Sequence, residues 1–476
     1  MNIYLFDQRY RLEVYETLSI FLPSDEIVFL DSISDDGLII DTSNGIKIKY
    51  FVNGESFYEN HREVESFNLD SFISFKMVLK YELVSFFKAF FNKSSPWGIL
   101  TGIRPVKVAT ALLETRSREL SLDYLENKML LSPEKAKLIL DISNTQGDIR
   151  EKITKNSYSL YINIPFCTGR CSYCSYSTLI LEKNGGIVKP YIKSMLKEIG
   201  QLKKSLEGRK LSTIYIGGGT PTSLKAEDLR FLLEGVNKIF DLEEIEEFTV
   251  EAGREDSLSL EKLKILKDNK VTRISLNPQS FKPNTLLEIG RRQDNSNLIR
   301  MYEEARNLDF DSINMDLIIG LPKEDLDDFN KTLEVIKSLS PDNLTVHALA
   351  LKKGSKLLQD NDNLQKEYLE AEKMMERALE FGKSEGYVPY YLYRQKRILG
   401  NLENIGFSKP DKICKYNIYM MEELQDIIGV GMGSSSKFLK GNNRFINHRN
   451  FMNMRDYLEK LEDIIEEKRE LIQNEK

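Results

Sequence analysis

The chain has 476 residues, of which 41% are apolar and 29% are charged, and this composition is typical of a globular protein with two or three domains. Its net charge of −6 argues against general nucleic-acid binding, which needs a basic surface. Asp7, Arg9 and Arg11 fall where a signal peptide would be apolar, and no later segment approaches about 18 uncharged apolar residues. We therefore expect a cytoplasmic protein that binds neither nucleic acid nor membrane.

Residues 1–150 are predicted to form an N-terminal α+β domain. The strand-like runs EIVFL, GLIIDT and GIKIKYFV are accompanied by Asp-Gly and Asn-Gly turn signals, and helical periodicity begins at about Phe72. The stretch PWGILTGIRPVKVATALLE then places the only Trp before an amphipathic helix. Two interpretations stay open for it: the helix starts beneath a buried Trp, or Arg104 and Lys107 face the carboxylates of a ligand.

Residues 155–350 show a repeated strand–helix pattern that is typical of parallel crossover connections. A charged helix of period 3.6 separates each strand from the next. The predicted strands are SLYINI, TIYIGG, EEFTVEA, TRISLN, SINMDLII and NLTVHALA. Six such units predict an α/β fold in which the sheet curls into an incomplete parallel (β/α)6 barrel. In such a barrel, chemistry gathers at the carboxyl ends of the strands.

Residues 351–476 are predicted to form a C-terminal α/β extension. The segment starts with a long helix, LQKEYLEAEKMMERALEFGKSEG, and continues through the aromatic stretch YVPYYLYRQK. It ends in LEKLEDIIEEKRELIQNEK, whose charge density predicts a solvated helical face.

Three of the four cysteines lie in the loop that follows the first barrel strand. Cys167, Cys171 and Cys174 have the spacing C-x3-C-x2-C, which in a reducing compartment indicates a metal site and not a disulfide framework. A structural zinc site would need a fourth ligand, and the available thiol, Cys414, lies far along the chain. A [4Fe–4S] cluster with three protein thiolates instead leaves one iron open for a small molecule.

This spacing resembles that of the radical S-adenosylmethionine (SAM) superfamily, in which the amino and carboxylate groups of SAM chelate the open iron. The resemblance implies that an electron from the cluster cleaves SAM to methionine and a 5′-deoxyadenosyl radical. Tyr173, just before Cys174, matches the superfamily, and the resemblance makes Tyr173 and Tyr176 the catalytic candidates.

After the second strand, the sequence Gly217-Gly218-Gly219-Thr220-Pro221 resembles the superfamily loop that binds the SAM amino group. Glycines at this position would let the backbone approach a ligand, although the same sequence is also typical of a tight turn.

Polar residues also end the third, fourth and fifth strands: Glu251, Gln279 and Asp316. A shared ligand at the end of the sheet explains them better than separate turns, although a capping role remains open for each one.

A narrower resemblance is to the oxygen-independent coproporphyrinogen III oxidase (dehydrogenase) group. It is carried by YINIPFC, GGGTP, the turn at Gln279, GRRQ and MDLIIGLP, while LTGIRP and YLYRQK resemble the HemZ-type branch. The resemblance implies one SAM on the cluster and a second SAM beside it. The residues that it assigns to SAM are Tyr161, Gly217, Gly218, Gly219, Thr220, Glu251, Gln279, Arg291 and Asp316.

The reaction implied by this resemblance converts two propionate side chains of coproporphyrinogen III to vinyl groups by oxidative decarboxylation, giving protoporphyrinogen IX. It would be an anaerobic step of heme biosynthesis, with reduced flavodoxin or ferredoxin as electron donor and a monomeric enzyme. A tetracarboxylate substrate needs cations, for which the candidates are Arg104, Lys107, Arg394 and Lys396.

Two departures keep alternative functions open. Tyr176 stands where the decarboxylases have a further cysteine, and Asn163 stands where they have a histidine. Heme chaperones of the same family also lack that cysteine, but Tyr416 stands where they have a histidine ligand for heme. An anaerobic heme-degrading radical SAM methyltransferase shares the same core. Cys414 is expected to be a buried structural thiol, with heme ligation as the alternative.

Overall fold

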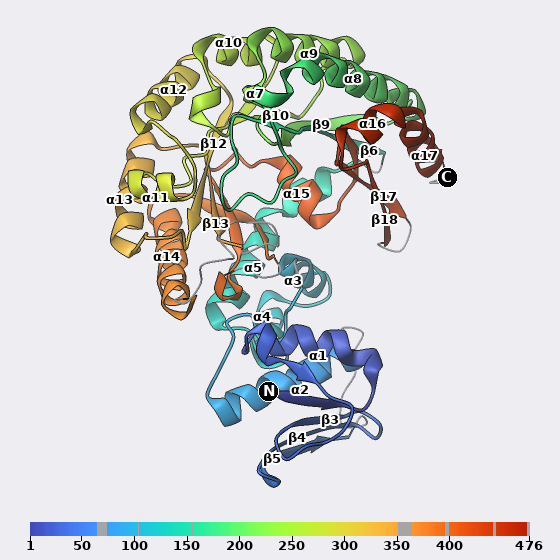
Figure 1. The fold of residues 1–476 in the computed structure, drawn as a ribbon, viewed down its shortest axis with the longest axis vertical. Coiled ribbons are helices and arrows are strands. Elements are labelled where there is room, and N and C mark those ends of the chain that lie inside the picture. Colours follow the sequence, from blue (N-terminus) through green and yellow to red (C-terminus); the bar gives the residue numbers. More distant parts are fainter. Residues whose placement is uncertain are drawn as a thin grey trace. The chain divides into compact units, whose positions relative to one another are not determined.

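The computed structural model describes residues 1–63, 74–102, 104–154, 156–350, 364–395, 399–440 and 444–473. The chain forms two compact units, residues 1–143 and 144–476, and each is described by itself (Figure 1). Lys396, a predicted substrate residue, lies outside the described residues.

The first unit contains a mixed five-stranded sheet with the order β2-β1-β3-β4-β5 among the described residues. The strand β1 (Asn2–Leu5) lies between β2 (Val28–Phe29) and β3 (Gly37–Asp41) and runs parallel to both. The strands β3, β4 (Ile46–Val52) and β5 (Glu55–Arg62) pair in antiparallel fashion. The predicted α+β class and the three strand-like runs are confirmed, and the sequence interpretation missed β1 and β5.

Helices complete the first unit. The helices α1 (Arg11–Leu18) and α2 (Phe75–Phe91) pack on each other, and α2 also packs on the sheet. The ring of Phe86 lies 5.8 Å from that of Tyr50 on β4 and 4.8 Å from that of Tyr58 on β5. Further along are α3 (Pro105–Leu113), α4 (Arg118–Asn127) and α5 (Pro133–Thr145). Trp97 is 1% exposed and precedes α3, so the burial of this Trp is confirmed, while a contact of Arg104 and Lys107 with a ligand stays a prediction.

In the described part of the second unit, the strands form one 11-stranded sheet, whose parallel part follows the predicted strands in chain order. These are β6 (Ser157–Ile164), β9 (Lys210–Gly218), β10 (Glu247–Glu251), β11 (Arg273–Ser275), β12 (Ser312–Ile319) and β13 (Asn343–Ala348). Each is parallel to the next. The incomplete parallel barrel is therefore confirmed.

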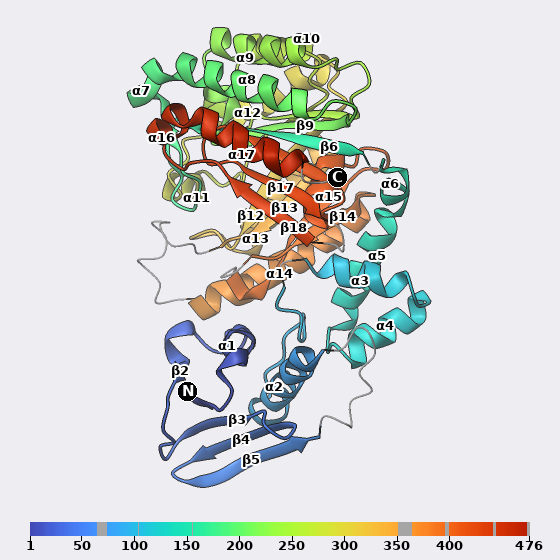
Figure 2. The same cartoon turned by 90° about the vertical axis from the view of Figure 1, so that its right-hand side faces the viewer.

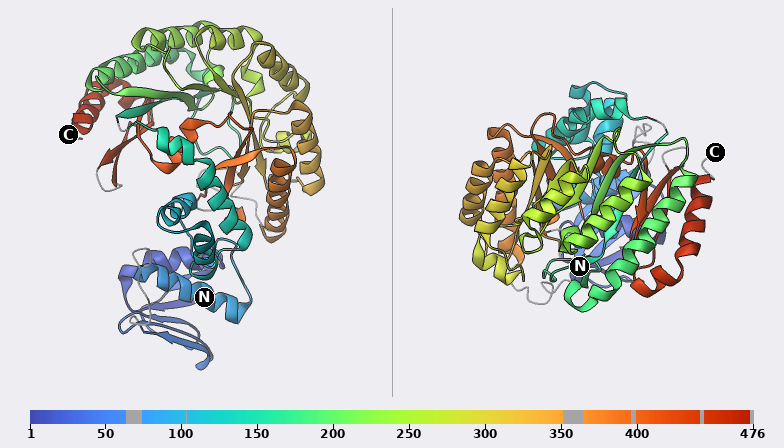
Figure 3. Two further views of the ribbon diagram at one scale, coloured as in Figure 1. Left: turned by 180° about the vertical axis from the view of Figure 1, so that it is seen from behind. Right: turned by 90° about the horizontal axis from the view of Figure 1, so that it is seen from above.

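Helices cover the outer face of this curved sheet (Figures 1 and 3). They are α8 (Val188–Ser205), α9 (Ala226–Ile239), α10 (Leu260–Asp268), α12 (Asn295–Asn307) and α13 (Leu326–Leu339). Each buries an apolar stripe, for example Leu229, Leu232 and Val236 of α9. The core of this unit therefore lies between these helices and the sheet. The inner face of the sheet, opposite the helices, takes no part in this packing.

The predicted C-terminal extension continues the same sheet, so the sequence boundary at residue 350 falls within one compact unit. After α14 (Leu364–Ser384), β14 (Val388–Tyr393) and β15 (Asn404–Ser408) add antiparallel strands next to β13. Beyond α15 (Lys415–Glu422), β16 (Asp426–Val430) runs parallel to β6 at the other end. It is followed by the antiparallel pair β17 (Ser435–Lys440) and β18 (Arg444–Arg449).

The chain ends with α16 (Met454–Glu459) and α17 (Leu461–Gln473), and α17 packs against α8 (Figure 2). The last helix has the predicted solvated face, on which Glu462, Asp463, Glu466 and Glu467 are exposed. Its other face was not predicted: Ile464, Ile465, Lys468 and Ile472 are buried there, at the spacing of an apolar helical stripe. Among the described helices, none combines the length and the apolar character needed to cross a membrane.

Candidate active site

A cavity of about 730 Å³ lies on the inner side of the second unit, where the carboxyl ends of the parallel strands meet. Its wall brings together residues that lie far apart in the sequence, from Tyr161 to Met452. The predicted site residues that line it are Tyr161, Cys167, Cys171, Tyr173, Cys174, Tyr176, Gly218, Gly219, Thr220, Glu251, Gln279, Arg291 and Asp316.

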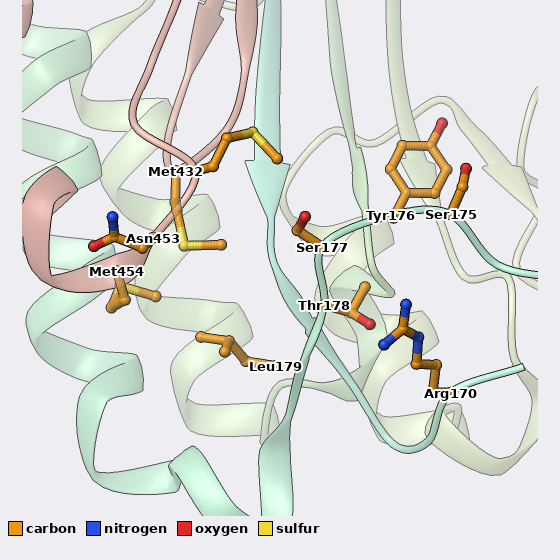
Figure 4. A pocket seen from close by; sticks show the side chains of 10 residues that line it. Arg170, Ser175, Tyr176, Ser177, Thr178, Leu179, Met432, Asn453 and Met454 are labelled. Atoms are coloured by element: carbon orange, nitrogen blue, oxygen red, sulfur yellow. The ribbon is translucent and has the colours of Figure 1, made fainter. Parts of the chain in front are cut away.

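A smaller hollow of about 280 Å³ lies beside the loop that follows Cys174 (Figure 4). It shares Tyr176 and Met432 with the large cavity, and Arg170 contributes to its wall. Tyr176, which is 61% exposed, extends from this loop into the region that the two hollows share. The space around the cysteine loop is therefore open to a ligand on more than one side.

The three thiols of the cysteine loop all reach the large cavity. Cys167 ends the short strand β7 (Phe166–Cys167), and its Sγ lies 3.3 Å from the Thr220 hydroxyl oxygen. The Cys171 Sγ accepts a hydrogen bond of 3.1 Å from Arg254 Nη1. No three His, Cys, Asp or Glu side chains in the described ranges converge on one metal position. A [4Fe–4S] cluster does not require this, because each thiolate binds a different iron.

Cys414 lies elsewhere and has a structural role. Cys414 lies at the start of α15 and is 4% exposed. Its thiol donates a hydrogen bond of 3.1 Å to Glu247 Oε1. The other oxygen of Glu247 accepts from the backbone N–H of Lys415 at 2.9 Å. Burial also raises the pKa of the Cys414 thiol. Cys414 is not among the residues that line the cavity, so the zinc site that would have used it as fourth ligand is not formed.

The glycines of the GGGTP loop pass directly against the strand and loop that lead to the cysteines. The Gly219 N–H donates to Ile164 O at 2.8 Å, and the Thr220 N–H donates to Phe166 O at 2.8 Å. A Cβ atom at Gly218, where φ is +113°, would lie 2.3 Å from Asn163 Oδ1. A Cβ atom at Gly219 would lie 2.4 Å from Phe166 O. The close approach that requires glycine is thus already made within the protein.

Two carboxylates at the strand ends have opposite pKa shifts. Burial raises the pKa of Glu251 to about 7, although the Tyr215 hydroxyl donates to it at 2.7 Å. Asp316 is partly buried, which raises its pKa, but nearby His347 and a hydrogen bond of 2.7 Å from Asn314 lower its pKa overall. At neutral pH the cavity therefore contains one ionised carboxylate and one that exchanges a proton readily.

Gln279 and Arg291 shape the cavity between these carboxylates. Gln279 has a left-handed backbone, and its N–H donates to Asp316 O at 2.9 Å. Its Oε1 is buried without a hydrogen-bond partner among the described residues, so it can accept a hydrogen bond from a ligand. The Arg291 guanidinium donates to the carbonyl oxygens of Gly253 and Asn277 and thereby ties neighbouring strand ends together.

The aromatic wall of the cavity was not predicted. The ring of Tyr215 stacks on that of Tyr416 at 4.5 Å, and Tyr161 continues the stack at 6.1 Å from Tyr215. Tyr391 and Tyr393 of β14 add a second stacked pair at 6.2 Å. These residues make one side of the cavity suitable for a large flat or partly apolar ligand.

Strand periodicity explains why Tyr393 and not Arg394 faces the cavity. Tyr391, Tyr393 and Gln395 line it, and successive side chains of a strand point to opposite sides. Arg394 is 4% exposed and donates to Asn401 O at 3.3 Å, and burial lowers its pKa to about 10. The structure therefore places Arg394 in the interior and not with the other predicted site residues.

Other predicted residues are not among those that line this cavity of the second unit. Arg104 starts α3 and Lys107 lies within it, so both belong to the first unit. Gly217 is not a lining residue, because it lies against Tyr215 and the Glu251 carboxylate. Their contacts with substrate or SAM remain predictions.

Sequence reasoning also missed Arg254, His347 and Arg449, all of which line the cavity. The available signal for Arg254 was its position just after the third strand, in the segment EAGRED. His347 lies on β13, with its Nε2 3.7 Å from Asp316 Oδ2 and its Nδ1 3.4 Å from the Tyr393 hydroxyl. Arg449 comes from the distant strand β18, for which no local signal existed.

The residues present fit a [4Fe–4S] cluster with SAM. Three thiols line the cavity, and the Cys171 sulfur accepts a hydrogen bond from the charged donor Arg254. The unpartnered Gln279 Oε1 and the Glu251 carboxylate offer acceptors in the same cavity. The lining thus combines soft thiol ligands with polar groups, as a thiolate-bound cluster and a polar cofactor require.

Comparisons with known proteins agree with this geometry. Residues 161–336 match the Radical SAM superfamily. The chain is 38% identical over 440 residues to the oxygen-independent coproporphyrinogen-III oxidase-like protein HemZ of Bacillus subtilis, covering 90% of this chain and 87% of that protein. It is 35% identical over 195 residues to the heme chaperone HemW of the same organism, covering 41% of this chain and 51% of that protein.

The fold is also found in a solved structure. Coproporphyrinogen III oxidase (HemN) from Escherichia coli superposes with a TM-score of 0.53 and 22% identity, covering 67% of this chain and 72% of that one. The chain therefore belongs to the radical SAM superfamily, as a member of the HemN/HemZ-like family that uses a [4Fe–4S] cluster and S-adenosylmethionine.

Proposed function

We propose that the protein is an oxygen-independent coproporphyrinogen III dehydrogenase, which converts two propionate side chains to vinyl groups. The observation that carries this proposal is the similarity to HemZ over 90% of the chain, combined with one cavity that joins three thiols, strand-end carboxylates and an aromatic wall. For each propionate, CO2, one hydrogen atom and one electron leave the substrate. We further propose reduced flavodoxin or ferredoxin as the electron donor, an unidentified final electron acceptor and a monomeric enzyme.

The cofactor residues in this proposal are those of the cavity. Cys167, Cys171 and Cys174 would hold the cluster, and the Gly218–Thr220 backbone with Glu251, Gln279 and Asp316 would hold one or two SAM molecules. When bound, the cluster and SAM together supply one-electron chemistry that removes a hydrogen atom from carbon. Glu251 can accept a hydrogen bond from a ribose hydroxyl while Tyr215 donates to the same carboxylate at 2.7 Å.

The substrate carboxylates need a cation, and Arg449 is the residue that the cavity offers. Among the described lining cations, Arg254 and Arg291 already donate to protein acceptors, and His347 lies between Asp316 and Tyr393. The Arg449 guanidinium is exposed and makes no hydrogen bond or ion pair with described residues. A guanidinium binds a carboxylate with two parallel hydrogen bonds and keeps it ionised, as loss of CO2 requires. We propose Arg449 for this role. Arg394 does not fit it, because its side chain is buried and does not line the cavity.

The experiment is product analysis under strict anaerobiosis. The reconstituted protein is supplied with SAM, dithionite, an oxidised electron acceptor and coproporphyrinogen III. We expect mass spectrometry to show the loss of two carboxyl groups and the formation of protoporphyrinogen IX. Formation of 5′-deoxyadenosine without loss of CO2, together with a methylated or ring-opened product from heme, would favour the methyltransferase instead.

A heme chaperone is the second candidate, and His347 is the observation that favours it. His347 lines the cavity and could ligate an iron, whereas Tyr416, at the position of the chaperone histidine, is 6% exposed within the tyrosine stack. A stoichiometric heme complex that survives desalting, is lost in His347→Ala and passes heme to an acceptor protein would place this function first.

A further inference from the structure

Arg254 is a charged residue held against a ligand of the cluster. It follows β10, and its Nη1 donates to the Cys171 Sγ at 3.1 Å. Arg254 is 6% exposed and Cys171 is 7% exposed, so water screens this contact little. An arginine that is buried against a thiolate sulfur is positioned to act on that sulfur and on the cluster that it binds.

The carboxylate of Asp256 fixes the guanidinium in this position. Arg254 Nε donates to Asp256 Oδ1 at 2.9 Å, and Arg254 Nη2 donates to Asp256 Oδ2 at 2.6 Å. The Thr168 hydroxyl, from the cysteine loop itself, donates to the same carboxylate at 3.1 and 3.2 Å. Arg254 is therefore connected to the cysteine loop at Cys171 directly and at Thr168 through Asp256.

Cys167 receives a different kind of contact. Its Sγ neighbour is the neutral Thr220 hydroxyl, which also lies 2.8 Å from Gly219 O. One hydroxyl hydrogen can serve only one of these two acceptors. Arg254 thus brings a fixed positive charge to the thiols, and Thr220 brings a shared neutral donor.

We propose that Arg254 is a positioning residue that raises the reduction potential of the cluster through its hydrogen bond to Cys171. On reduction the cluster gains one electron from its reductant, and the added negative charge is shared with the thiolate sulfurs. A donor with a positive charge stabilises this reduced state more than the oxidised state. The proposal rests on the cluster alone and does not depend on the tetrapyrrole substrate.

The test measures the potential directly, in the absence of SAM and substrate. Reconstituted wild-type protein, Arg254→Gln, Arg254→Lys and Asp256→Asn are titrated anaerobically, and the reduced cluster is quantified by electron paramagnetic resonance. In Arg254→Gln we expect at least a tenfold fall in the ratio of reduced to oxidised cluster at a fixed potential, which is about 59 mV for one electron. Arg254→Lys keeps the charge without the fixed guanidinium fork, and its ratio should fall between those of the wild type and Arg254→Gln. Asp256→Asn removes a negative charge beside the cluster and should raise the ratio.

The matched control is Arg300→Gln, which removes an exposed arginine that contacts Asn297. We expect its potential to equal that of the wild type. An unchanged potential in Arg254→Gln with full iron content would overturn the proposal and leave Arg254 a structural role. If that variant does not retain iron, an unchanged potential in Arg254→Lys, which loses the guanidinium fork on Cys171, would overturn it equally.

SAM affinity separates this role from cofactor binding. Because Arg254 uses three of its N–H groups on Asp256 and Cys171, we expect the SAM dissociation constant of Arg254→Lys to stay within about twofold of the wild type. A tenfold loss of SAM affinity with an unchanged potential would instead assign Arg254 to the SAM carboxylate.

Discussion

Lys468 of the last helix and Glu198 of α8 form an ion pair of 2.6 Å in which both side chains are fully buried. The same carboxylate accepts from the Gly431 N–H at 2.9 Å and from the Tyr457 hydroxyl at 2.7 Å. Lys468 also donates to Gly429 O at 2.6 Å. The last helix is thereby connected to the segment that carries Met432 and Gly433 to the cavity wall.

The first prediction follows from this pair. Lys468→Met leaves the Glu198 carboxylate buried without its cation, so we expect the free energy of unfolding to fall by about 3–5 kcal/mol. Urea unfolding of the two proteins measures this loss. Lys197→Met is the control, because its partner Glu462 is on the surface and the side chains are 51% and 69% exposed. Equal effects of the two substitutions would contradict the prediction.

The second prediction concerns the four cysteines. Anaerobically reconstituted protein should contain about four irons and four sulfides per chain, and Ala at Cys167, Cys171 or Cys174 should abolish this content. Cys414→Ala should keep the iron, because that thiol binds Glu247 and does not line the cavity. Iron and sulfide analysis of each variant gives the answer. Bound zinc in place of iron, or loss of iron in Cys414→Ala, would be incompatible with the cluster assignment.

Local sequence was sufficient to predict the parallel strands and the cysteine loop. Strand identity depends on short apolar runs such as SINMDLII, and β12 has the same bounds as that run. The cysteine spacing is equally local. These features could be predicted because the residues that determine them are neighbours in the sequence.

The rest of the site depends on contacts between distant residues. Arg254 contacts Cys171 from 83 positions away, and Arg449 comes from a strand added after the barrel. No local pattern distinguishes such residues from ordinary surface arginines. Arg394 is different, because alternation along YYLYRQ would have placed it on the side opposite Tyr393. The error there came from giving charge more weight than strand periodicity.

The third prediction concerns pH. Burial raises the pKa of Glu251 from 4.5 to about 7 in the folded protein, so the folded state binds this proton more tightly than the unfolded state does. The associated stability is present below the unfolded pKa of about 4.5 and is lost as the pH rises through about 7. Urea unfolding of cluster-free Glu251→Gln should therefore show a smaller loss of stability than the wild type between about pH 5 and pH 8, a range that includes the rise through about 7.

A matched control for the pH prediction is Glu324→Gln. Burial also raises the pKa of Glu324 to about 7, but Glu324 accepts from Ser280 and does not line the cavity. Both substitutions should flatten the pH dependence of stability, whereas only Glu251→Gln should weaken SAM binding. Identical pH dependence of unfolding in the wild type and Glu251→Gln would show that the carboxyl is not perturbed.

The last prediction compares Arg449 with Arg394 in the proposed reaction. Arg449→Ala should raise the KM for coproporphyrinogen III about tenfold or more, because it removes a bidentate carboxylate contact. Cleavage of SAM without substrate should remain at the wild-type rate, since Arg449 has no part in holding the cluster.

Arg394→Ala should instead lower the free energy of unfolding and leave KM within about twofold, because that side chain is buried against Asn401. Arg104→Ala tests whether the Arg104 guanidinium also binds a propionate. If it does, the KM for coproporphyrinogen III should rise in this variant. Steady-state rates of CO2 release and 5′-deoxyadenosine formation measure both reactions in each variant. A normal KM in Arg449→Ala together with a raised KM in Arg394→Ala would show that the substrate carboxylates bind on the other side of β14.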